Sequence, residues 1–107
     1  GESRGWQIFK KGNDVQFVIE LVDYGDKGFT STNYAYKNGK PWVIVQEKKS
    51  SKDAKPNSVE RAGWNDAGEL VLKQNEAGGK VDTLSDDDAN DLKKQAEAMY
   101  SKAGGKK

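Results

Sequence analysis

The 107-residue chain contains no cysteine and no histidine. Without cysteine it cannot form a disulfide, a thiolate zinc site or a cysteine nucleophile, and its redox compartment stays open. Without histidine it lacks the usual general base and the commonest metal ligand, so a Ser-His-Asp arrangement is excluded. These absences predict a protein that is not an enzyme and that uses no metal or other cofactor.

Long apolar runs are also missing. No segment approaches the ~20 consecutive apolar residues that a membrane-spanning helix needs, so no membrane association is predicted. Hydrophobic residues make up 34% of the chain and charged residues 33%, with 18 basic against 17 acidic side chains. A chain of this size and balance is expected to form one domain over residues 1–107, in which several strands share a compact core.

A hairpin is the clearest β signal in the sequence. Two strand-like runs, 29–36 and 41–46, flank Asn38-Gly39, and Asn-Gly favours a tight turn because both central residues need a positive φ. Alternation and turn residues predict further strands at 6–10, 15–22, 58–64, 69–74 and 81–84. In 15–22 one set of alternate residues is wholly apolar and the other is mixed. Residues 48–57 are polar and lysine-rich, which predicts a mobile loop.

The C-terminal segment predicts one amphipathic helix. Ser85 is a good N-cap, and three aspartates follow it where negative charge suits the helix dipole. Small and apolar residues then recur at three- and four-residue steps, and Gly104 is expected to end the helix before a frayed tail at 104–107. The repeating residues are Ala89, Leu92, Ala96, Met99, Tyr100 and Ala103.

Together these elements predict an α+β fold. It is an antiparallel, twisted β-meander of five to seven strands packed against one C-terminal α-helix. The alanine-rich stripe of the helix suits close packing on the sheet, and packing against a second copy, which would give a homodimer, is the open alternative. Strands in meander followed by Leu84-Ser85 and a helix are similar in organisation to small folds that bind single-stranded nucleic acid, such as the PUR-type domains. No diagnostic motif accompanies this similarity, so it assigns no site residue.

Acidic residues have structural interpretations. The run Asp86-Asp87-Asp88 enters a helix and lacks the alternation of a calcium loop, so helix capping explains it better than metal binding. Asp23 and Asp26 lie in a glycine-containing turn, where aspartate is common. An acid–base pair is therefore not expected there.

Aromatic and basic residues supply the leading functional hypothesis. Trp6, Trp42 and Trp64 are expected in the core, whereas Tyr34 and Tyr36 share a face that is either core or an exposed stripe. Residues 1–57 hold ten basic and seven acidic side chains, and most of the basic ones are lysines that lie near the hairpin. Lysines beside aromatics on a sheet are typical of surfaces that bind single-stranded DNA or RNA.

The sequence thus predicts a non-catalytic binding module for single-stranded nucleic acid. The alternative is a protein–protein interaction module, such as a virion component, an inhibitor or a secreted accessory domain, and carbohydrate binding on exposed tryptophans is a third hypothesis. Lysines that merely guard a sheet edge against aggregation are the structural alternative. The predicted nucleic-acid surface consists of Tyr34, Tyr36, Lys37, Lys40, Trp42, Lys48, Lys49 and Lys52.

Overall fold

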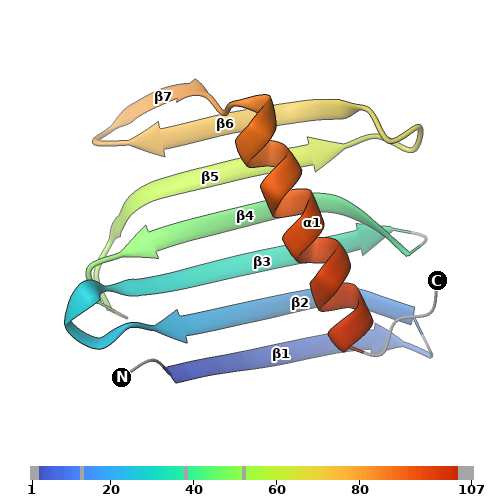
Figure 1. Ribbon diagram of the computed structural model, residues 1–107, viewed down its shortest axis with the longest axis horizontal. Helices are drawn as coiled ribbons and strands as arrows, with labels where there is room; N and C mark the ends of the chain where they lie inside the picture. Colours follow the sequence, from blue (N-terminus) through green and yellow to red (C-terminus); the bar gives the residue numbers. More distant parts are fainter. Residues whose placement is uncertain (1–2, 13, 38, 52, 104–107) are drawn as a thin grey trace.

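A computed structural model of the chain describes residues 3–12, 14–37, 39–51 and 53–103. Seven strands form a single sheet, and each strand pairs antiparallel with the next in chain order (Figure 1). One helix follows the last strand, which confirms the predicted α+β meander. The elements are β1 (Ser3–Lys11), β2 (Asp14–Asp23), the short 3-10 helix η1 (Gly25–Lys27), β3 (Phe29–Lys37), β4 (Lys40–Lys49), β5 (Pro56–Trp64), β6 (Leu70–Ala77), β7 (Lys80–Thr83) and α1 (Asp86–Lys102).

The helix begins where the sequence predicts. The Ser85 side chain accepts a hydrogen bond from the backbone N–H of Asp88 at 3.2 Å, and all three aspartates lie in the first turn. Each of the six predicted core-facing positions, Ala89 to Ala103, is buried. Gly104 and the predicted tail at 104–107 lie outside the described residues. No helix in the described ranges is long and apolar enough to cross a membrane.

The helix packs on its own sheet. Figure 1 shows α1 running diagonally across one face of the sheet, from the level of β6 to the level of β1. The core between them includes Tyr34, Ile44, Ala62 and Leu92, each at most 3% exposed. The apolar stripe of α1 is therefore buried against the sheet of the same chain. The structure does not show the alternative, a homodimer through this stripe.

The predicted hairpin is present between β3 and β4. Lys37 pairs with Lys40, and Gly39 has a φ of 78°, the left-handed region that glycine adopts most easily. Asn38 lies outside the described residues. Pro41 pairs with Tyr36 where the register shifts, so its missing N–H falls at an irregular position of a central strand.

The predicted loop at 48–57 is too long. Lys48 and Lys49 belong to β4, and Pro56 and Asn57 belong to β5. Lys48 pairs with Thr30 on one side and with Ser58 on the other, so ladder hydrogen bonding on both sides extends the strand despite its polar sequence. The remaining connection is six residues, 50–55, of which 52 is not described.

Candidate functional site

The two tyrosines of the predicted nucleic-acid surface are in the core. Tyr34 is 1% exposed and Tyr36 is 4% exposed, and the Tyr36 hydroxyl donates a hydrogen bond to the Ala96 carbonyl of α1 at 2.6 Å. Burial raises the pKa of both phenols well above their ordinary value; the charge of Glu20 adds to this effect at Tyr34 and the neighbouring Tyr34 adds to it at Tyr36. Neither ring can stack on a base. The exposed tyrosine stripe is thus excluded.

Only one of the three tryptophans that were expected in the core lies there. Trp64 is 4% exposed and lies in the core as predicted. Trp6 and Trp42, also expected in the core, are 45% and 48% exposed. Trp6 lies on the edge strand β1, where it lines a hollow with Met99 and Lys102 of α1 and stays half-exposed. Trp42 is the extra residue where the β3–β4 register shifts.

The predicted lysines do not form one surface. Lys37 and Lys40 lie at the hairpin, where the Lys37 ammonium is 5.7 Å from the centroid of the Trp42 ring and 3.2 Å from a carboxylate oxygen of Asp66. Lys48 and Lys49 lie at the other end of β4, ~25–30 Å away for a strand of this length. Lys52 lies outside the described residues. The seven predicted residues that the structure describes therefore separate into a core pair and two distant groups.

A different surface is continuous. No helix or strand that the structure describes covers the face of the sheet opposite α1, here called the open face, although Phe29 and Val59 near one end of it are buried. Residues paired across neighbouring strands point to the same face, so the registers define rows of side chains across the sheet. One such row is apolar over six of the seven strands. This apolar row is Phe9, Phe17, Ala35, Val43, Gly63 and Leu72.

The apolar row is accessible to solvent. Phe9 is 49% exposed, and Phe17, Ala35, Val43 and Leu72 are half-buried by their sheet neighbours. The rings of Phe9 and Phe17 are in contact, with centroids 6.0 Å apart. In the adjacent row, half-buried Ile19 and Val45 extend the apolar area.

Charged residues occupy the other side of the open face. The Arg61 guanidinium is 3.5 Å from the Glu76 carboxylate, and the Lys49 ammonium is 3.9 Å from the Glu47 carboxylate. Both pairs combine opposite signs on the same face of the sheet. The open face therefore has an apolar part bordered by balanced charge, the composition of a protein interface with a polar rim.

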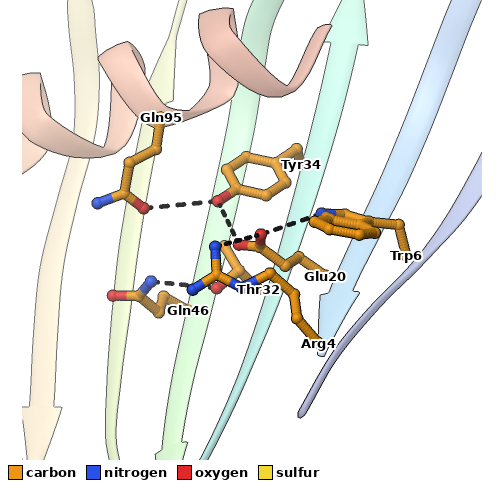
Figure 2. A network of polar contacts seen from close by, with 7 residues as sticks. All are labelled: Arg4, Trp6, Glu20, Thr32, Tyr34, Gln46 and Gln95. Atoms are coloured by element: carbon orange, nitrogen blue, oxygen red, sulfur yellow. Dashed lines mark hydrogen bonds and ion pairs between the residues drawn. The ribbon is translucent and has the colours of Figure 1, made fainter. Parts of the chain in front are cut away.

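The helix-covered face carries a polar network near β1 (Figure 2). The Glu20 carboxylate accepts hydrogen bonds from the Trp6 indole N–H at 3.0 Å and from the Tyr34 hydroxyl at 3.3 Å, and lies 3.7 Å from the Arg4 guanidinium. The Tyr34 hydroxyl is also 3.5 Å from the Gln95 side-chain oxygen of α1. The network thereby ties the edge strand β1 to β2, β3 and the helix.

A hollow of about 300 Å³ lies beside this network. Two of its lining side chains are paired with each other, because the Gln46 amide donates to the Thr32 hydroxyl at 3.1 Å. Among the described residues, every buried side-chain nitrogen or oxygen has a hydrogen-bond partner. The described ranges also contain no group of three acidic residues able to hold a metal ion. The network therefore has the properties of a structural network that holds β1 to the rest of the fold.

Sequence reasoning missed the open face although a signal existed. In 15–22 the wholly apolar set of alternate residues includes Phe17, Ile19 and Leu21, and these lie half-buried on the open face, whereas buried Val18 and Val22 come from the mixed set. The network around Glu20 joins residues of β1, β2, β3 and α1 that are distant in the sequence, so no local sequence pattern indicated it.

The chain matches a family described as "Protein of unknown function (DUF1481)" over residues 1–105. No curated protein and no solved structure matches the chain.

Proposed function

The chain belongs to the DUF1481 family of proteins of unknown function, and we propose that it is a non-catalytic protein-interaction module that docks through its open face. The observation that carries this proposal is the apolar row, which crosses six strands with no described element covering it. Contiguous exposed apolar patches larger than a few hundred Å² are rare on monomeric proteins and mark interaction sites.

Energetics support the choice of this face. Removing apolar surface from water stabilises an association by ~25 cal/mol per Å², so a patch of several hundred Å² contributes several kcal/mol when a partner covers it. Phe9 and Phe17 are the aromatic anchors of the open face, and their ring contact fixes them in position. Arg61, Glu76, Lys49 and Glu47 form its charged border. Aromatic anchors with a polar rim are the usual anatomy of a protein interface.

A catalytic role has less support. The chain has neither histidine nor cysteine, and the carboxylate of Glu20 already accepts two hydrogen bonds and faces Arg4. A carboxylate held in this way serves to position its neighbours, which suits a structural role better than acid–base work.

Photo-crosslinking at two adjacent residues tests the proposal. Phe9 and Ile8 are neighbours in β1 with 49% and 45% exposure, but Phe9 lies on the open face and Ile8 pairs with buried Val18 on the helix-covered face. A benzoylphenylalanine at position 9, in cells of the organism that encodes the chain, is expected to give protein adducts on a denaturing gel. The same group at position 8 is the control and is expected to give few. Equal yields at the two positions, or none at position 9, would contradict docking through the open face.

Single-stranded nucleic acid remains a second candidate, at a different corner of the molecule. It rests on the exposed Trp42 ring, the Lys37 ammonium 5.7 Å from its centroid and the nearby Lys40. Here one ring would stack on a base while the lysines meet phosphates.

Fluorescence anisotropy of a dye-labelled single-stranded oligonucleotide, titrated with the protein, tests this candidate. Binding at about 50 mM salt is expected to weaken steeply at higher salt, and Trp42→Ala is expected to abolish it. Trp6→Ala is the matched control, with a ring of similar exposure on the edge strand. Absence of binding, or an affinity indifferent to salt, would remove the candidate.

A further inference from the structure

We propose that the occupant of the open face is the open face of a second copy of this chain, so that two sheets pack face to face in a homodimer. This inference rests on the proposed function, because it names the partner for the same surface. Three properties of the face support a second copy: its area, its charge and the course of its apolar row.

The area fits a sheet better than a smaller ligand. The molecule is broad and thin, with principal extents of 37 × 31 × 19 Å. Seven strands spaced ~4.8 Å apart, with about nine residues each at ~3.3 Å, give a face on the order of 900 Å². A standard stable interface covers ~800 Å² per partner. A docked helix, ~10 Å wide, would leave most of such a face exposed, whereas a second sheet matches it in both dimensions.

The charge of the open face is balanced. Its two described ion pairs, Arg61 with Glu76 and Lys49 with Glu47, each contain one charge of either sign. Ion pairs of this kind present no strong charge of one sign, so they do not repel a second copy, and a strongly basic or acidic partner gains little from them.

The direction of the apolar row across the strands is compatible with a twofold-symmetric dimer. An interface between identical chains with twofold symmetry uses the same patch on both copies. A twofold axis lying in the interface along the row places the row of one copy over the row of the other. Phe9, Phe17, Val43 and Leu72 would then be covered together, and the packed sheets would lie ~10 Å apart as in a β-sandwich.

Sedimentation equilibrium of the purified chain over a range of concentrations tests this proposal. The wild-type protein is expected to approach twice its chain mass of 11.8 kDa as concentration rises. Phe9→Glu places a carboxylate at the end of the apolar row and is expected to weaken association at least about tenfold, which corresponds to ~1.4 kcal/mol. Ile8→Glu makes the same kind of change at a neighbouring residue of similar exposure on the helix-covered face and is expected to leave association unchanged.

Val45→Lys is the second open-face variant, located in central strand β4, and it is expected to dissociate the dimer even if Phe9→Glu fails to fold. Circular dichroism checks the fold of each variant. A wild-type chain that stays monomeric at the highest concentration overturns the second-copy inference, while position-9 adducts to a different protein would still support the proposed function. Equal dissociation by Ile8→Glu and Phe9→Glu also overturns it, because that result indicates pairing through the edge of β1.

Discussion

Replacing Ile44 with alanine is expected to lower the free energy of unfolding by about 2–5 kcal/mol. Ile44 is 0% exposed and lies in the core between Tyr34 on β3 and Ala62 on β5, its partners in the sheet. Truncation removes the transfer free energy of the missing carbons and leaves a cavity beneath α1 that the surrounding sheet closes only in part. The measurement is chemical denaturation followed by circular dichroism.

Ile8→Ala is the matched control for this experiment. The chemical change is the same, but Ile8 is 45% exposed on the edge strand and is expected to cost less than about 1 kcal/mol. If the two variants were destabilised equally, the interface between α1 and the sheet would not be the main core of the protein.

Raising the pH above about 10 is expected to destabilise the fold through Tyr34 and Tyr36. Burial, the largest cause at both residues, raises the pKa of each phenol above its ordinary value of 10.0. The unfolded chain therefore releases these protons at a lower pH than the folded chain does. The contribution is fully present below the unfolded pKa and is lost progressively as pH rises from there through the folded pKa, by up to ~1.4 kcal/mol per pH unit for each tyrosine.

Urea unfolding at a series of pH values between about 8 and 12 measures this effect. The double variant Tyr34→Phe with Tyr36→Phe is expected to show a flatter alkaline profile, with a lower stability near neutral pH because the 2.6 Å bond from Tyr36 to Ala96 is lost. Tyr24→Phe, which alters an exposed ring, is the control and is expected to keep the wild-type profile. A double variant as sensitive to alkali as the wild type would show that other groups cause the loss.

Local signals in the sequence were sufficient for most of the architecture. Ser85 and the recurring small residues from Ala89 to Ala103 predicted the helix and its buried side, because capping and periodicity depend only on near neighbours. Gly39 marked the hairpin for the same reason. The polar end of β4 was missed because Lys48 and Lys49 are held in the sheet by pairing with other strands, which local propensity does not contain.

The candidate surface was harder to predict. Alternation shows which side chains share a face of a strand, but it does not show which face the helix covers. Phe17, Ile19 and Leu21 form an apolar set that is typical of a core-facing side. The structure instead places α1 over the opposite face, which carries Val18 and Val22. Trp42 was assigned to the core for its size, although the register shift beside it turns its ring outward.

The order of the strands has a consequence for folding kinetics. Because every strand pairs with its neighbour in the chain, each hairpin closes only a short connecting loop, which costs little entropy. The exception is α1, whose Ala96 carbonyl meets Tyr36 across 60 positions of sequence. We therefore expect hairpins to assemble early and the docking of α1 to be the slow step that commits the chain to its native state.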